Sequence, residues 1–147
     1  MTLKNLLGIS LDAVPPDPAA IGKLLAAAQR NLADAQLAGL SAENRFDAAY
    51  KAIMQPAVVA LQSNGCRALT SKPGHHQTAI QTLTTSVGVA PAQVIVLDAL
   101  RKLRNLSDCS GDLIPDAVAA ECLASAQALQ GHVLAWLKAH RPDLLTG

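Results

Sequence analysis

The segment from Arg104 to Cys109 holds the residues of this chain whose types best suit chemistry. A guanidinium such as that of Arg104 offers a planar fork of donors that fits a phosphate or a carboxylate. A thiol such as that of Cys109 is a nucleophile when a nearby base activates it, although a lone cysteine at a helix end is more often a small packed residue. The segment therefore indicates phosphate recognition or, if a histidine approaches from elsewhere, nucleophilic chemistry.

Arg101, just before this segment, is spaced like a helical neighbour of Arg104 and Asp108 within it. Arg101, Arg104 and Asp108 follow Leu97 at steps of three and four, so all four share one helix face. The alternative to a binding role is that Arg104 and Asp108 pair along the helix, an exposed contact worth roughly 0.2–0.5 kcal/mol. The polar residues around Asn105 are equally compatible with chemistry that simply ends a helix.

A second candidate group is His75-His76, directly after Pro73-Gly74. Adjacent helical residues diverge by about 100°, so these two imidazoles cannot hold one metal ion together as an i, i+4 pair would. The alternative is that one histidine caps a helix and the other is solvated. The sequence has no phosphate-binding loop, dinucleotide fingerprint, zinc-protease motif or serine-hydrolase elbow, and we expect neither a metal nor a cofactor.

Apolar residues recur at helical spacing along most of the chain, which predicts five helices with a capping residue or proline at several ends. We expect them from Pro18 to Gly39, Ser41 to Asn64, Gly74 to Ser86, Pro91 to Asp108 and Pro115 to His140. Pro56 should kink the second helix, and Cys66 to Gly74 should be a loop. The β-branched run from Val94 to Val96 could form a strand, but its helical period continues to Leu106.

These elements predict an all-α fold, an antiparallel bundle of four to five helices. The 147 residues form one domain, 1–147, with a core of about 17–140. Half of the residues are apolar, and because aromatic residues make up 2% the core must be built from Ala, Leu, Val and Ile.

Composition excludes several classes of protein. Twelve basic residues against eleven acidic ones argue against a protein that coats nucleic acid or anionic membrane by bulk charge. The charges are unevenly spread, because five basic residues and one acidic residue occupy 67–104, and acidic residues follow; this indicates a binding surface, a self-complementary contact in an oligomer, or solvated helix faces. Three cysteines without metal or disulfide spacing, and no apolar run long enough to span a membrane, predict a cytoplasmic protein with reduced thiols.

Arg104-Asn105, three further residues and Cys109, placed before the last long helix, together resemble the motif of the HEPN domains (higher eukaryotes and prokaryotes nucleotide-binding). That motif reads Arg, a polar residue, a few spacers and His, and the His-bearing start of the third helix adds to the resemblance. Cys109 stands at the motif His, and Gly111 stands where one subfamily has Tyr. Family members include dimeric, metal-independent endoribonucleases and non-catalytic partners of small nucleotidyltransferases in toxin–antitoxin pairs.

The resemblance implies catalytic positions at Arg104, Asn105 and Cys109, and we add binding positions at Arg101, Arg104, Asp108, His75 and His76. Because a thiol is a poorer acid–base group near neutral pH than an imidazole, we expect a non-catalytic or weakly catalytic HEPN-like module. It would bind a nucleotide, RNA or a nucleotidyltransferase partner, form a homodimer through the fourth helix, and hold an anion beside Ser110-Gly111. The alternatives are an endoribonuclease toxin and a helical scaffold without a ligand.

Overall fold

The computed structural model describes residues 2–71, 74–111 and 113–145, apart from the side chain of Cys109. The long helices in these ranges are α1 (Pro18–Asp34), α2 (Ala42–Ser63), α5 (Pro91–Ser110) and α6 (Asp116–His140). Two short helices, α3 (His75–Gln81) and α4 (Leu83–Val87), lie between α2 and α5. The strands β1 (Leu11–Ala13) and β2 (Cys66–Ala68) and the 3-10 turns η1 (Leu3–Leu6) and η2 (Pro142–Leu145) complete the fold.

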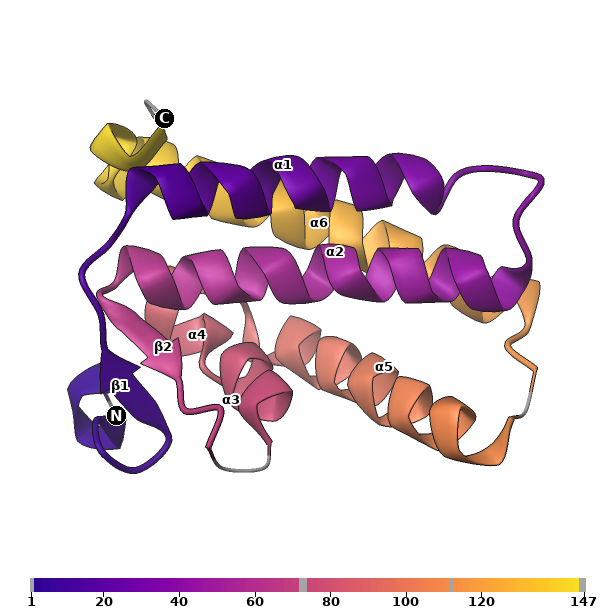
Figure 1. The fold of residues 1–147 in the computed structure, drawn as a ribbon, viewed down its shortest axis with the longest axis horizontal. Coiled ribbons are helices and arrows are strands. Elements are labelled where there is room, and N and C mark those ends of the chain that lie inside the picture. The colour runs from indigo at the N-terminus through magenta and orange to yellow at the C-terminus, as the bar shows by residue number, and fades with distance from the viewer. Residues whose placement is uncertain (1, 72–73, 112, 146–147) are drawn as a thin grey trace.

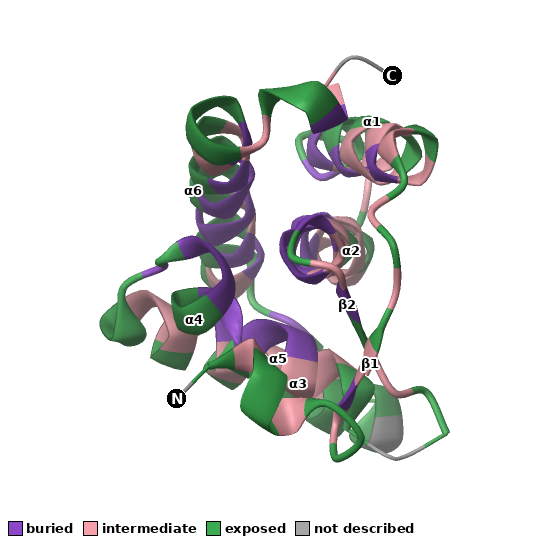
Figure 2. Cartoon of the chain, turned by 90° about the vertical axis from the view of Figure 1, so that its left-hand side faces the viewer, coloured by how far each residue is buried: buried purple, intermediate pink, exposed green. Residues whose placement is uncertain are grey.

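Helix α2 lies at the centre of the molecule. In the end-on view it is surrounded by α1, α6 and the layer formed by α3 and α5 (Figure 2). The long helices alternate in direction along the chain, so that α1 and α5 run one way and α2 and α6 return (Figure 1). The chain is therefore mostly helical, as the sequence predicts, with one small two-stranded sheet at the end where α1 begins.

Local capping chemistry sets where several helices begin and end. The Asp17 carboxylate accepts a hydrogen bond from the Ala19 amide at 3.0 Å, and Ser41 Oγ accepts one from the Asn44 amide at 3.2 Å. Helix α5 ends at Ser110 and is capped by Gly111, whose φ of 72° lies in the left-handed region that favours glycine. The expected starts at Pro18 and Ser41 are thus confirmed to within a residue, and α2 continues past Pro56 to Ser63.

Two expectations about the middle of the chain are wrong. The predicted loop begins with a strand, because Cys66–Ala68 pairs antiparallel with Leu11–Ala13 and Arg67 forms an ion pair with Asp12 at 3.1 Å. The predicted third helix is two helices that meet at Thr82. The Thr82 hydroxyl donates to the Thr78 carbonyl at 2.8 Å, a local bond that competes with regular helical hydrogen bonding.

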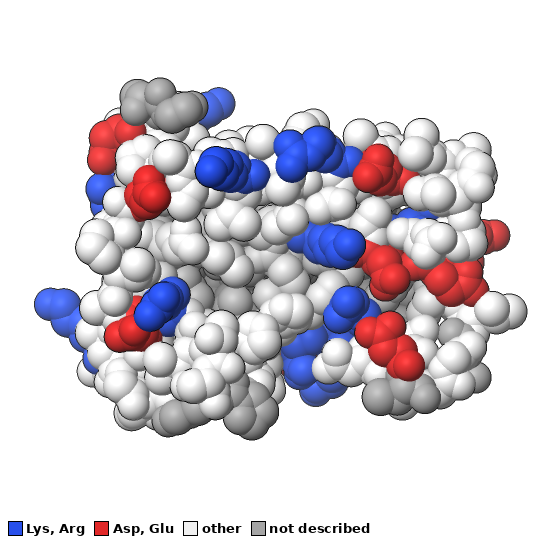
Figure 3. Space-filling view, in the orientation of Figure 1, with Lys and Arg blue, Asp and Glu red and all other residues white. Residues whose placement is uncertain are grey.

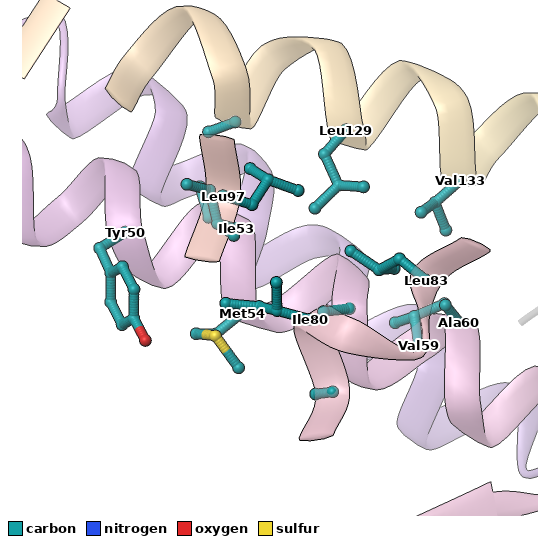
Figure 4. Packing of buried hydrophobic residues seen from close by; sticks show 14 of the residues in the cluster. Tyr50, Ile53, Met54, Val59, Ala60, Ile80, Leu83, Leu97, Leu129 and Val133 are labelled. Carbon is teal, nitrogen blue, oxygen red and sulfur yellow. The ribbon is translucent and has the colours of Figure 1, made fainter. Parts of the chain in front are cut away.

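The core is built mainly where α2 meets α6, α1 and the short helices. Buried side chains of α2 such as Ile53 and Val59 pack beneath Leu129 and Val133 of α6, with Leu97 of α5 and Ile80 of α3 at the side (Figure 4). Tyr50 stands at the margin of this packed group (Figure 4). Near the far end of α6 the indole of Trp136 stacks on the His140 ring at 4.9 Å between centroids.

None of the helices in the described ranges combines the length and the apolar character that crossing a membrane requires.

Candidate functional site

Arg104 lies in the seam between α5 and α2. Its guanidinium carbon is 4.8 Å from the centroid of the Tyr50 ring, a cation–π arrangement. Its nitrogens are 3.8 Å from Asp47 Oδ1 and 3.8 Å from Asp108 Oδ2, which is too long for a hydrogen bond. The side chain is 27% exposed, and its buried Nε has no hydrogen-bond partner among the described residues. Arg104 is therefore attracted to both carboxylates but hydrogen-bonded to neither.

Tyr50 links Arg104 to the start of α3. The Tyr50 hydroxyl lies 3.2 Å from His76 Nδ1, and the tautomer of His76 decides which group donates. The ring of exposed His75 meets the His76 ring edge-on at 4.6 Å. Arginine, tyrosine and histidine from α5, α2 and α3 thus meet in one place, and we refer to Arg104, Tyr50 and His76 as the Arg104 cluster.

Burial and the neighbouring cations set the protonation of this cluster. Burial raises the pKa of Tyr50 to about 12, although the charges of Arg104 and Arg101 act in the opposite direction. Burial also lowers the pKa of His76, and the positive charges of His75, Arg104 and Arg101 lower it further. At neutral pH the phenol is therefore protonated and the imidazole is neutral, so a tyrosine hydroxyl and an uncharged base lie beside a permanent cation.

Arg101 forms an ion pair with Asp98 on its own helix. Its Nε donates to Asp98 Oδ1 at 2.8 Å, and the two side chains are only 12% and 13% exposed. Lys102 adds a longer ion pair to Asp98 at 3.5 Å. Burial alone would raise the pKa of Asp98, but the hydrogen bond and charge of Arg101 lower it overall. Arg101 therefore contributes positive potential to the Arg104 cluster, with its Nε donor already satisfied.

A cleft of about 270 Å³ opens on the side of Arg104 that faces the start of α2 and the end of α5. The cleft is lined by Arg104 and by three carboxylates, those of Glu43, Asp47 and Asp108, and it reaches Gly111. Blue and red side chains lie side by side over this part of α2 and α5 (Figure 3). The expected hollow beside Ser110-Gly111 therefore exists, but its walls are predominantly acidic and would repel an anion.

The remaining predicted site residues are dispersed. Asn105 is exposed, and Asp108 is 57% exposed at the rim of the acidic cleft. The Cys109 side chain lies outside the described part of the structure. Leu97 is fully buried and Arg101 is 12% exposed, so the first part of the α5 face expected to form a homodimer faces the interior of this chain, whereas Arg104 and Asp108 farther along it are more exposed.

Two residues of the site escaped the sequence analysis. Tyr50 is 1% exposed, as helical spacing along α2 would suggest, but its contacts with Arg104 and His76 depend on how three helices meet. Asp47 was not singled out, although it lies one turn before Tyr50 on α2. A tyrosine and an aspartate one helical turn apart on a largely apolar face are the signal that could have identified them.

The two cysteines whose side chains are described, Cys66 and Cys122, are free and buried. Burial raises the pKa of the Cys122 thiol to about 12, and burial also raises that of Cys66. Both thiols are protonated at neutral pH, which makes them poor nucleophiles.

Among the described side chains, no three His, Cys, Asp or Glu residues are grouped closely enough to hold a metal ion. Comparison of the chain with protein-family models, with curated proteins and with solved structures gives no match. The site must therefore be interpreted from its own geometry.

Proposed function

We propose that the Arg104 cluster binds a phosphate group of a nucleotide or of RNA, and that the chain is a non-catalytic or weakly catalytic module of the HEPN-like kind. The observation that carries this proposal is the meeting of Arg104, Tyr50 and His76 from three helices, with Arg104 Nε left without a hydrogen bond. The oxygens of Asp47 and Asp108 lie 3.8 Å from the nearest nitrogens of Arg104, which is too far for a hydrogen bond. The guanidinium can therefore donate hydrogen bonds to a phosphate.

The phosphate would approach Arg104 from the side of α3 and not through the acidic cleft. On that side lie His75, His76 and the positive potential of Arg101, whereas Glu43, Asp47 and Asp108 line the other side. The cation–π contact with Tyr50 holds the guanidinium plane in place before a ligand arrives, which lowers the entropic cost of binding.

His76 supports an endoribonuclease as the second candidate function. Cys109 stands where the HEPN motif has its acid–base histidine, and His76 on another helix places a neutral imidazole against the hydroxyl of Tyr50, whose ring contacts the Arg104 guanidinium. A neutral imidazole beside a guanidinium is a suitable general base for a 2′-hydroxyl. We rank this function second because Tyr50 already occupies His76 Nδ1.

Two further expectations remain predictions. A homodimer through α5 would need the exposed side chains of Ile95 and Leu106, because Leu97 and Arg101 are used within the chain. A nucleotidyltransferase partner also stays a prediction from the resemblance.

The decisive measurement is calorimetric titration of the protein with a ribonucleoside monophosphate. We expect Arg104→Ala to weaken binding about 10- to 100-fold, since a hydrogen bond to a charged group contributes about 1.5–3 kcal/mol. Arg104→Lys should also weaken it, because lysine keeps the charge but loses the fork. Arg45→Lys on α2, whose arginine pairs with Asp116 at 2.7 Å, is the matched control.

Unchanged affinity in Arg104→Ala, with helical content preserved by circular dichroism, would exclude phosphate recognition by this residue. Cleavage of RNA without added metal by the unmodified chain, abolished by His76→Ala, would favour the endoribonuclease instead.

A further inference from the structure

A second concave surface lies between α1 and α2. It is a groove of about 620 Å³, and its polar lining residues are Arg30, Asn31, Asp34, Lys51 and Gln55. Two cations and one carboxylate line it, so its charge balance is opposite to that of the acidic cleft beside Arg104.

The cations of this groove have no ion-pair partner within the described ranges. The basic residues that form ion pairs within the described ranges are Arg45, Arg67, Arg101, Lys102, Arg104 and Arg141. Lys23, Arg30 and Lys51 form no ion pair with a described residue, and all three side chains are exposed. Lys23 and Arg30 are about two turns apart on α1 and therefore lie along the same side of that helix. Unpaired positive charge thus collects along α1 and α2, where Figure 3 shows blue side chains with few red ones.

The groove leads towards the Arg104 cluster. Lys51 lies one helical turn after Asp47, the residue whose carboxylate is 3.8 Å from Arg104 Nε. Figure 3 shows the same continuity, because blue side chains over α1 and α2 lead to the mixed group over α2 and α5. A chain of phosphates with one group at Arg104 would therefore pass the Asp47 carboxylate and then meet Lys51 and Arg30.

A pair of amides lies inside the groove. Asn31 Nδ2 donates to Gln55 Oε1 at 3.0 Å, which joins α1 to α2. The other two polar atoms of the pair, Asn31 Oδ1 and Gln55 Nε2, form no hydrogen bond with another described residue. An acceptor and a donor side by side match a 2′-hydroxyl, which donates and accepts and which distinguishes RNA from DNA.

We propose that the α1–α2 groove binds the sugar–phosphate backbone of single-stranded RNA that continues from the Arg104 cluster. This inference rests on the proposed function and names its ligand as an oligonucleotide. Arg30 and Lys51 contact phosphates, Lys23 extends the track, and the Asn31–Gln55 pair contacts ribose. The groove residues include no aromatic side chain on which a base could stack, so binding depends on salt and shows little base preference.

The test compares a ribonucleoside monophosphate with a labelled single-stranded RNA over a range of salt concentrations. We expect Arg30→Ala and Lys51→Ala each to leave mononucleotide binding unchanged. Each should weaken RNA binding and reduce the slope of log K against log salt by about 0.7, the value for one phosphate contact on a single strand. Asp34→Asn should strengthen RNA binding. Lys138→Ala is the matched control, because this exposed lysine lies on α6.

The outcomes separate the two proposals. If Arg104→Ala abolishes mononucleotide binding but Arg30→Ala, Lys51→Ala and Lys138→Ala give equal RNA affinities, the groove proposal fails and the proposed function stands. If the unmodified chain binds neither ligand, both fail. Equal affinity for single-stranded DNA, or a preference for duplex RNA, would overturn the assignment of single-stranded RNA to the groove.

Discussion

Helices α5 and α6 are both long and apolar in part, yet they contribute to the molecule in opposite ways. α6 places a continuous series of side chains in the core along most of its length, namely Ala119, Cys122, Ala126, Leu129, Val133 and Leu137. α5 buries Leu97 and Leu100, and beyond them Leu103 packs partly buried against the core beside the charged Arg101 and Arg104. Full apolar burial is thus confined to the first half of α5, and charged side chains join the inward face in the second half.

This difference determines how much each helix contributes to stability. Burying an apolar side chain is worth roughly 1.5–3 kcal/mol, so α6 stabilises the fold at almost every turn. A half-buried guanidinium beside a tyrosine contributes little net stability, because loss of hydration offsets much of the attraction. The charged groups in the second half of α5 should therefore contribute less to stability than the core of α6, and variants of the two helices should behave differently.

The largest effect should come from the core contacts of α6. We expect Leu129→Ala to lower the free energy of unfolding by about 2–4 kcal/mol, because it leaves a cavity above α2. Leu106→Ala on α5, where the side chain is 63% exposed, should change it by less than about 0.5 kcal/mol. Urea denaturation measures both, and equal losses would contradict the proposed division between the helices.

An intermediate effect should come from the ion pair in the middle of α5. Arg101→Ala leaves the nearly buried Asp98 with only the longer contact to Lys102, so we expect a loss of about 1–2 kcal/mol at neutral pH. The double variant Arg101→Ala, Asp98→Ala should recover part of that loss, which a double-mutant cycle would measure. If the two single losses simply add, the pair is not coupled.

The smallest effect should be the pH dependence contributed by His76. Its pKa is lowered from 6.5 in the folded chain, so below about pH 6.5 the unfolded chain takes up a proton before the folded one does. Stability should therefore fall as the pH drops through this window, by about 0.5 kcal/mol from this partly exposed group. His76→Gln should remove that component, whereas His140→Gln, at an exposed residue of α6, should retain it. Unfolding midpoints measured between about pH 7 and pH 5 test the difference.

Helix starts could be predicted where they depend on neighbouring residues, because Asp17 and Ser41 cap the amides that follow them. The ends were predicted less well, since α1 ends at Asp34 and not at Gly39, and α5 continues past Asp108 to Ser110, where Gly111 caps it. The strand at Cys66–Ala68 could not be found in this way, because three residues show no clear alternation and their partner strand, Leu11–Ala13, is remote in sequence.

The site was predictable only in part, for a geometric reason. Helical spacing correctly places Leu97, Arg101 and Arg104 on one face, but spacing does not say whether that face meets solvent, another chain or the rest of the same chain. Tyr50 reaches Arg104, and His76 reaches Tyr50, only because α2 and α3 both pack beside α5. Such a meeting of three helices depends on tertiary packing and leaves no local pattern.

The stacking of Trp136 on His140 has a practical consequence for spectroscopy. Trp136 is the single tryptophan of the sequence, so intrinsic fluorescence excited in the indole band reports the environment of the last turns of α6. The Arg104 cluster lies on other helices, so an opening of α5 alone would be silent in tryptophan emission, and the absorption of Tyr50 would be the signal that records it.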